Sequence, residues 1–235
     1  MNILSIDTSS KIFSLAVSRN EKILACRSIA LKDVLSSAIV PALKKILREA
    51  RVSLPQLDGF AIGLGPGSFT SLRVGLSTVK AFAFATCKPV VGIPSLDVIA
   101  MNAVIDNNED ICVMTDAKRN LIYNCLYEKN GALLRRKTDY LLTGIDELFR
   151  KIKRKTLLIG DGIRIFQAEI LKRKDTSFPA VTLAGEQDWH PSAANLAILA
   201  YRRFKEKKFD CADTLVPLYL YPEDCQVHVK CRPYA

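Results

Sequence analysis

Residues 63–75, GLGPGSFTSLRVG, have the types and spacing best suited to chemistry. An apolar segment ending at Ile62 leads into three glycines and a proline, and a helix is expected to open at Ser68. Glycine permits positive φ and close backbone approach, and Pro66 presets one turn dihedral. Such a loop presents bare amide groups at a helix N-terminus, where anions can be held. The loop therefore indicates a phosphate site, although a helix packed tightly on its strand gives the same pattern.

The loop does not match the commonest phosphate-binding motifs. No Lys-Ser or Lys-Thr pair follows Gly67, and GLGPGS does not fit G-x-G-x-x-G. Asp7 ends the first apolar segment and precedes Thr8-Ser9-Ser10, and a carboxylate beside hydroxyls suits metal–phosphate chemistry. The same residues equally suit a turn cap. The candidate phosphate-binding residues are Asp7, Thr8, Ser9, Gly65, Gly67 and Ser68.

Other reactive side chains are scattered along the chain. His190 and His228 are the only histidines, and they form neither HxxxH nor HExxH, which excludes a helix-borne metal pair. Cys225, His228 and Cys231 could meet a metal, but no fourth ligand lies near them in sequence, so no metal site is predicted. Residues 116–119 are interpreted as a solvated charged turn. No Ser-His-Asp set and no pair of carboxylates for acid–base work stands out, so no catalytic residue is assigned.

The composition is typical of a globular cytoplasmic protein. The 235 residues, 49% hydrophobic and 25% charged, suffice for one large domain or two lobes. Lys80 interrupts the longest apolar run, at 78–87, so no membrane span is expected. The segment MNILSIDTSS lacks the basic start of a signal peptide. Seven cysteines without a CxxC motif favour a reduced compartment.

The net charge of +10 is concentrated in the second half, in clusters at 135–137, 151–155, 172–174 and 202–208. This pattern fits either a solvated surface or attraction to an RNA backbone or an acidic partner. No aromatic-rich RNA-binding motif accompanies the clusters, so the chain is not expected to read bases.

These side chains must be positioned by alternating strands and helices. The hydrophobic pattern predicts strands over 2–7, 12–18, 22–29, 57–62 and 90–93, and helices over 32–50, 69–87 and 94–103. It then predicts strands over 111–115, 121–127 and 156–160, and helices over 144–153, 162–172 and 191–208. Pro41 should kink its helix, and Asn130-Gly131 marks a hairpin turn. The polar stretch 105–110 indicates a boundary between two lobes.

The helix predicted over 69–87 is apolar nearly all round. Such a helix must be buried on more than one side, and its own sheet can cover only one. The helix over 32–50 shares the wide apolar stripe. We therefore expect a helix–helix partner interface, the alternative being burial by this protein's second lobe. The residues predicted for that interface are Leu35, Ile39, Leu72, Gly75, Leu76, Val79, Ala81 and Phe82.

Five segments together resemble one family in sequence and in order. They are ILSIDTSS at 3–10, GLGPGSFTSLRVGLSTVKAFA at 63–83, VVGIPSLDVIA at 90–100, TDAKRNLIY at 115–123 and LVPLYL at 215–220. They are similar to the TsaB family, also called YeaZ, an accessory subunit of bacterial threonylcarbamoyladenosine synthesis beside the tRNA anticodon. The block GPGSFT-x-LR-x-G is the most specific of them.

The resemblance implies a two-lobed actin-like, Hsp70-like (ASKHA) α/β fold, each lobe a mixed sheet with helices. Residues 1–104 would form the N-terminal lobe, and 105–235 the C-terminal lobe, whose final segment could pack back on the first. It implies a non-catalytic scaffold that pairs with the catalytic subunit TsaD through first-lobe helices. TsaE would join that pair, and a homodimer would form when TsaD is absent.

The same resemblance makes the candidate phosphate-binding residues vestigial. It implies no cofactor bound tightly by this subunit alone, with ATP or ADP a matter for the assembled complex, and tRNA contacted indirectly or weakly. Three departures from the family pattern concern the pairing surface: Ser71 for a usual glycine, residues 32–34 (Lys-Asp-Val) for His-Ser-Glu, and Tyr221 for a common arginine. The competing interpretation is an active enzyme of the same fold, an ATP-dependent transferase or a peptidase. A free-standing RNA-binding module rests on charge alone.

Overall fold

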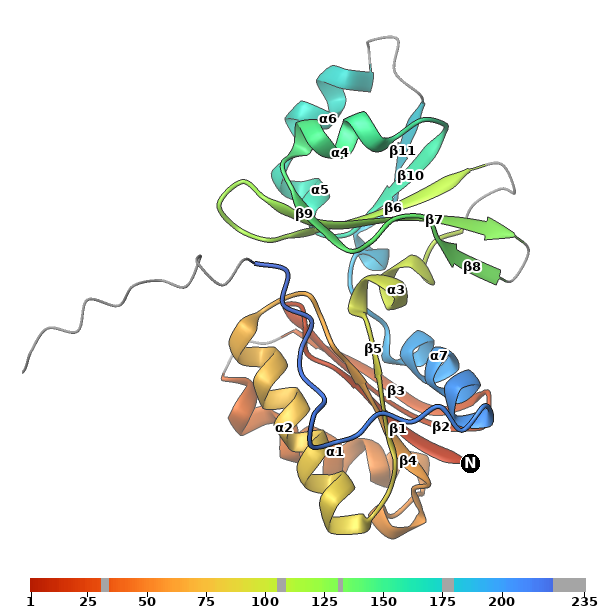
Figure 1. Ribbon diagram of the computed structural model, residues 1–235. Helices are drawn as coiled ribbons and strands as arrows, with labels where there is room; N and C mark the ends of the chain where they lie inside the picture. The colour runs from red at the N-terminus through yellow and green to blue at the C-terminus, as the bar shows by residue number, and fades with distance from the viewer. Residues whose placement is uncertain (31–33, 105–108, 131–132, 175–179, 222–235) are drawn as a thin grey trace, which may run out of the picture.

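The computed structural model describes residues 1–30, 34–104, 109–130, 133–174 and 180–221. These residues form two lobes, one above the other in Figure 1, each built on a mixed β-sheet. No helix of this described part is long and apolar enough to cross a membrane.

The first sheet has the strand order β3-β2-β1-β4-β5. Strands β1, β2 and β3 form an antiparallel meander, whereas β4 and β5 extend the sheet in parallel with β1. Strand β1 is buried almost throughout, as a central strand covered on both faces should be. The strands are β1 (Asn2–Asp7), β2 (Ile12–Arg19), β3 (Lys22–Ala30), β4 (Gly59–Gly63) and β5 (Val90–Ile93).

The second sheet repeats this topology. Strands β6, β7 and β8 form the antiparallel meander, and β10 and β11 continue it in parallel with β6. A further short strand, β9, pairs with β7. The strands are β6 (Asp110–Asp116), β7 (Ile122–Asn130), β8 (Leu133–Arg136), β9 (Leu141–Thr143), β10 (Thr156–Ile159) and β11 (Val181–Leu183).

Helices cover both faces of the first sheet. α1 (Leu35–Ala50) and α2 (Phe69–Thr86) bury their apolar stripes against one face, around Phe13 and Phe60. α7 (Ala193–Lys205) packs on the other face, against strands β1 to β5. α3 (Ser95–Ala100) lies where the chain passes to the second lobe and packs on β6 and β7. The second lobe carries α4 (Ile145–Lys151), α5 (Gly162–Ile165) and α6 (Gln167–Lys174); two 3₁₀ turns are η1 (Leu54–Gln56) and η2 (Glu186–Asp188).

Most of the predicted elements are confirmed, with differences at their edges. The helix predicted over 162–172 is two helices, α5 and α6, separated at Phe166. Strands β8, β9 and β11, of three or four residues each, were not predicted. α1 runs through Pro41 without interruption, so the kink stays a prediction. The turn residue Gly131 and the boundary residues 105–108 lie outside the described residues.

The division into lobes differs from sequence order. Residues 105–235 were assigned to the second lobe with a final segment that could pack back, but α7 is a full layer of the first lobe. Leu196, Ala200 and Phe204 on α7 are buried against Ile3 and Val91 of the first sheet. After α7 the chain passes along α2 and ends, within the described residues, beneath the second lobe (Figure 1).

Candidate functional site

Helix α2 has one buried stripe and an opposite face that the lobe leaves accessible. Leu72, Leu76, Val79 and Ala83 follow helical spacing and are buried in the first-lobe core. The opposite side carries small and apolar residues, and Phe84 on it is 84% exposed. A single exposed phenylalanine is ordinary, but together with the other apolar residues on this face it forms a patch of the kind that marks an interaction surface. The other residues of this face are Val74, Ser77, Thr78, Ala81 and Ala85, half-buried or exposed.

This burial pattern corrects the predicted interface residues. Six of them, Leu35, Ile39, Leu72, Gly75, Leu76 and Val79, are buried in the chain's own first lobe, and of these Ile39 also lines the groove between α1 and α2. Ala81 is exposed and Phe82 is half-buried. The alternative, burial by the second lobe, does not explain the buried stripe of α2 either, because that stripe packs on the first sheet. The accessible apolar residues of α1 and α2 lie outside these buried stripes.

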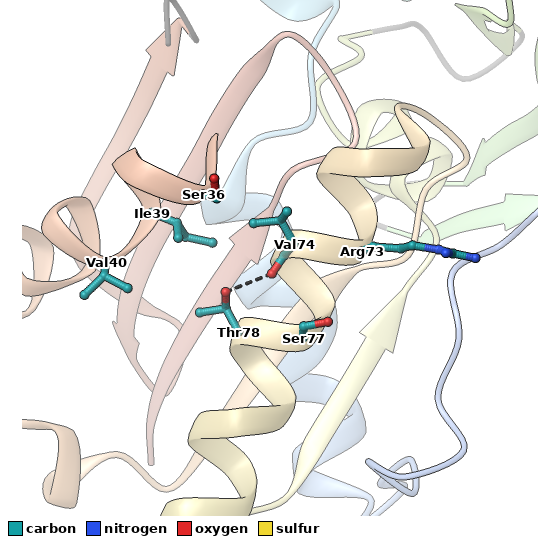
Figure 2. Close-up of a pocket in the computed structure, with 7 residues that line it drawn as sticks. All are labelled: Ser36, Ile39, Val40, Arg73, Val74, Ser77 and Thr78. Atoms are coloured by element: carbon teal, nitrogen blue, oxygen red, sulfur yellow. Dashed lines mark hydrogen bonds between the residues drawn. The ribbon is translucent and has the colours of Figure 1, made fainter. Parts of the chain in front are cut away.

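A groove of about 390 Å³ separates α1 from α2 on this side (Figure 2). Its walls combine aliphatic groups with short hydroxyl side chains, and Val40 at its edge is 44% exposed. The Thr78 hydroxyl donates a 2.8 Å hydrogen bond to the Val74 carbonyl, which turns its methyl group outward from the helix backbone (Figure 2). Apolar grooves between helices accept side chains of a partner helix. The lining residues are Ser36, Ile39, Val40, Arg73, Val74, Ser77 and Thr78.

Asp7 does not face solvent, whereas a catalytic or metal-binding carboxylate must be accessible to its substrate or metal. It is fully buried, and Oδ1 accepts hydrogen bonds from the amide of Ser9 at 2.8 Å and its hydroxyl at 2.6 Å. Oδ2 accepts a 2.7 Å bond from the Ser95 hydroxyl, which itself accepts the Gly65 amide at 3.0 Å. A Cβ on Gly63 would lie 1.9 Å from Oδ2, so the backbone seals the remaining side. Asp7 therefore ties strand β1 to the glycine loop.

The glycine loop lies directly on the turn between β1 and β2. The Ser68 amide donates a 2.9 Å bond to the Ser9 carbonyl, and a Cβ on Gly67 would meet that oxygen at 2.1 Å. Gly65 has a φ of 88°, which glycine adopts without strain. The Thr8 hydroxyl donates to the Ser71 carbonyl at 2.8 Å. The predicted phosphate-binding residues thus separate into two groups.

One group faces a cleft between the lobes and the other does not. Ser9, Gly67 and Ser68 line this cleft of about 1300 Å³. Asp7, Thr8 and Gly65 are used in the contacts that build the loop, so the six residues do not form one site. Whether the three cleft-facing residues bind phosphate stays a prediction.

The second lobe brings a charged turn to the same cleft. Residues 116–119 were interpreted as a solvated turn, and Lys118 and Arg119 are indeed exposed; the turn also lines the cleft together with Asp161 and His190. Lys118, Arg119 and Asn120 all have left-handed backbone, with φ between 53° and 66°. The Lys118 amide bonds to the Asp116 carboxylate at 2.7 Å, and the Asp116 amide bonds to Asp161 at 3.0 Å. The sequence does carry a pattern that could have indicated a functional turn here. It is an acidic residue followed by two cations and an asparagine, directly after a buried strand.

The departures noted in the sequence have different surroundings. Ser71 is half-buried, lines the cleft, and its hydroxyl lies 3.0 Å from that of Ser68. Val34 is 71% exposed at the start of α1, whereas residues 32 and 33 lie outside the described residues. Tyr221 contacts Ala117 and Tyr123 of the second lobe. Cys225, His228 and Cys231 also lie outside the described residues, within which no group of His, Cys, Asp and Glu could hold a metal ion.

The ionisation of Asp7 gives a pH test of its structural role. Burial raises the pKa of Asp7 above its usual 3.8, and the hydrogen bonds from Ser9 and Ser95 oppose that rise. The folded protein therefore binds this proton more tightly than the unfolded chain does. The contribution of Asp7 to the free energy of unfolding should increase as pH falls through the raised pKa, and be complete below 3.8.

We expect the wild type to gain stability on acidification relative to Asp7→Asn, which cannot take up this proton. Urea unfolding of both proteins, at several values between about pH 7 and pH 4, measures the difference, in which the other carboxylates cancel. If the wild type instead loses unfolding free energy relative to Asp7→Asn on acidification, the pKa of Asp7 is depressed and the carboxylate is stabilised as an anion.

Two lobes with the same sheet topology, a glycine loop against the β1–β2 turn and a cleft between the lobes are the features of the two-lobed actin-like, Hsp70-like (ASKHA) fold. A family model described as TsaD, tRNA N6-adenosine threonylcarbamoyltransferase, matches residues 31–223. The chain belongs to that family and, within it, to the TsaB (YeaZ) group.

Named relatives and a solved structure support the assignment. The tRNA threonylcarbamoyladenosine biosynthesis protein TsaB of Buchnera aphidicola subsp. Schizaphis graminum is 31% identical over 172 residues, 71% of this chain and 81% of the relative. The protein of the same name from Bacillus subtilis is 28% identical over 94% of each chain. The structure of YeaZ from Pseudomonas aeruginosa superimposes with a TM-score of 0.76 at 22% identity, over 93% of this chain and 99% of that one.

Proposed function

We propose that this chain is a non-catalytic scaffold subunit in the synthesis of threonylcarbamoyladenosine beside the tRNA anticodon. It would pair with a TsaD-type transferase through the accessible side of α1 and α2. The observation that carries this proposal is the exposed apolar face of α2 beside the α1–α2 groove. The names of the relatives supply the pathway.

The shape of the α2 face favours a partner helix over a small ligand. Ser77, Ala81 and Ala85 are small, so another helix backbone can approach closely. Phe84 projects beside them and supplies a large apolar anchor, the kind of residue on which interfaces depend. The groove next to α2 offers space for side chains of the partner. A transferase subunit of the same family would present helices of matching type.

The surroundings of Asp7 favour a role without catalysis. Both carboxylate oxygens are occupied by hydroxyl and amide donors of the chain, and the side chain is fully buried. A catalytic carboxylate must reach substrate or metal, which this geometry does not allow without opening the loop. We infer that the chain supports its partner in the cytoplasm by position rather than by chemistry, with ATP or ADP bound only in the assembled complex.

Further partners follow from the same proposal. TsaE would join the pair in a ternary complex, and two copies of this chain would pair through α1 and α2 when the transferase is absent. Sedimentation velocity of this chain alone and mixed with its own organism's TsaD tests both. A complex that excludes the homodimer is expected; independent sedimentation of the two proteins at micromolar concentration would contradict the proposal.

A second candidate function is an active enzyme of the same fold, an ATP-dependent transferase or a peptidase. The cleft favours it, because Lys11 and the 116–119 turn place cations and a carboxylate on opposite sides of a large cavity. Turnover by the purified chain alone distinguishes the two candidates.

Part of the basic charge is neutralised within the second lobe. Asp110 is 4% exposed and accepts hydrogen bonds from Lys137 at 2.6 Å and from Arg154 at 2.8 Å. These two cations therefore neutralise a buried carboxylate. Replacing either of them should destabilise the fold, so their variants cannot report on tRNA binding alone. Arg135, whose side chain is 77% exposed, and Lys153 are exposed members of the two clusters and are not the residues that bind Asp110.

We expect Arg135→Glu with Lys153→Glu to weaken tRNA binding by the assembled complex. If each cation meets one phosphate, the log–log salt slope should fall by about 2, at ~0.9 per phosphate. Titration of labelled tRNA at several salt concentrations measures this, with Lys22→Glu on β3, exposed and outside the four basic clusters, as a control for charge reversal elsewhere on the chain. Pairing with TsaD should be unchanged, because the proposed pairing helices α1 and α2 lie in the first lobe. If the tRNA affinity and its salt slope are unaltered, these cations do not contribute to tRNA binding and serve only the solubility of the protein.

A further inference from the structure

The last described segment, residues 214–221, contacts both lobes within a few residues. On the first lobe, the Leu218 amide donates a 2.8 Å hydrogen bond to the Leu64 carbonyl at the start of the glycine loop. The Tyr219 ring lies 5.4 Å from that of Phe69, and its hydroxyl accepts a 3.0 Å bond from Arg73 Nε. The Arg73 guanidinium is itself stacked 3.9 Å above Phe69.

Two residues further on, the chain is attached to the second lobe. The Tyr221 hydroxyl donates a 2.6 Å hydrogen bond to the Ala117 carbonyl, in the charged turn that lines the cleft. Its ring meets the Tyr123 ring edge-on at 6.1 Å. Leu220 and Tyr221 both pack on the second-lobe core. The segment therefore spans the gap between the glycine loop and the turn opposite it.

The lobes are joined elsewhere at α3, which hydrogen bonds hold to the second lobe. Asp97 on α3 accepts hydrogen bonds from Tyr127 at 2.6 Å and from Tyr140, and Asn102 donates to the carbonyls of Asp188 and His190 at 2.8 Å. In Figure 1 the C-terminal segment rises beside α2, while α3 lies on the other side of the crossing chain. A joint fixed at α3 leaves opening about that joint as the easiest relative motion of the lobes.

We propose that residues 214–221 act as a latch that holds the two lobes closed over the cleft. Its second-lobe attachment is Tyr221, and its first-lobe attachment is the Leu218 amide with the Tyr219–Arg73–Phe69 stack. Tyr219 is 44% exposed, so this attachment is open to water and reversible. Arg73 also lines the α1–α2 groove, which places one latch contact beside the proposed partner surface. The latch sets how far the cleft opens to solutes, independently of the proposed function.

Trp189 is the single tryptophan of the chain and lines the cleft, so its fluorescence reports on closure. It is 7% exposed and donates to the Ala184 carbonyl at 2.9 Å. We expect Tyr221→Ala to increase acrylamide quenching of Trp189 clearly above the wild-type value. Loss of an edge-on ring pair and a hydrogen bond should speed exchange of the Leu218 amide about tenfold or more.

Tyr221→Phe removes only the hydroxyl and should have the same effects at smaller size, so the test survives poor folding of the alanine variant. Tyr201→Phe, on α7 and away from the cleft, is the matched control and should behave as the wild type. Unchanged Trp189 quenching and unchanged Leu218 exchange in folded Tyr221→Ala or Tyr221→Phe would show that the segment does not hold the lobes. Neither measurement needs a partner, so this failure is distinct from a failure of the scaffold proposal.

Discussion

Replacing Ala81 with arginine should abolish pairing of this chain with the transferase subunit while leaving its own fold intact. Ala81 lies on the exposed side of α2, opposite the buried stripe of Leu76 and Val79. In the free chain a guanidinium there remains in water. In a closely packed helix pair it would be desolvated without a partner, which costs about 3–5 kcal/mol, a hundredfold or more in affinity.

Titration calorimetry with TsaD measures the affinity, and circular dichroism with thermal unfolding checks the fold. Ala168→Arg, an exposed alanine on α6 of the second lobe, is the matched control and should pair normally. The homodimer should weaken in parallel with the complex. Normal pairing by folded Ala81→Arg would move the interface away from this face of α2. Leu76→Glu is unsuitable here, because Leu76 belongs to the core.

Replacing Gly63 with alanine should produce a large loss of stability in the site region. The new Cβ would lie 1.9 Å from Asp7 Oδ2 and 2.9 Å from Ser95 Oγ, so the carboxylate and its donors must shift. Overpacking of this kind costs about 3 kcal/mol of unfolding free energy. Gly144→Ala is the control, because no atom lies within 4 Å of its added Cβ.

A double-mutant cycle with Asp7→Ala separates the clash from other effects. Asp7→Ala alone leaves the Ser9 and Ser95 donors without their acceptor, at a cost of about 1–3 kcal/mol. In the double variant the Gly63 methyl enters the space of the missing carboxylate, so the combined loss should be smaller than the sum by about 1 kcal/mol or more. Additive losses would place the strain elsewhere than at Asp7.

The periodicity of the sequence was sufficient to predict the strands of the first lobe and its helices α1 and α2. Strands such as β1 and β5 are continuous apolar runs, and α1 and α2 carry regular stripes, so local pattern and tertiary burial agree. The pattern could not show which stripe of α2 faces the sheet, because the helix is apolar on both sides. Leu72, Leu76 and Val79 are buried against the core, whereas Ser77, Ala81 and Phe84 are exposed.

Contacts between distant segments were beyond the reach of local pattern. Ser95 follows Asp7 by 88 residues, yet it completes the hydrogen bonds that remove this carboxylate from solvent. α7 lies late in the chain, yet it covers the first sheet, because its apolar stripe matches a face that the first lobe leaves open. Tyr221 was noted only as a departure from the family, whereas its ring and hydroxyl attach the chain end to the second lobe.

The most direct test of the scaffold proposal is an assay of ATP hydrolysis and threonylcarbamoyl transfer to tRNA with purified components. The chain alone should form no modified nucleoside and hydrolyse ATP negligibly. Assembled with TsaD and TsaE, the Asp7→Asn variant should support transfer as well as the wild type, whereas Ala81→Arg should not. Steady ATP hydrolysis by the purified chain alone, abolished by Asp7→Asn, would contradict the proposal and make this subunit an enzyme in its own right.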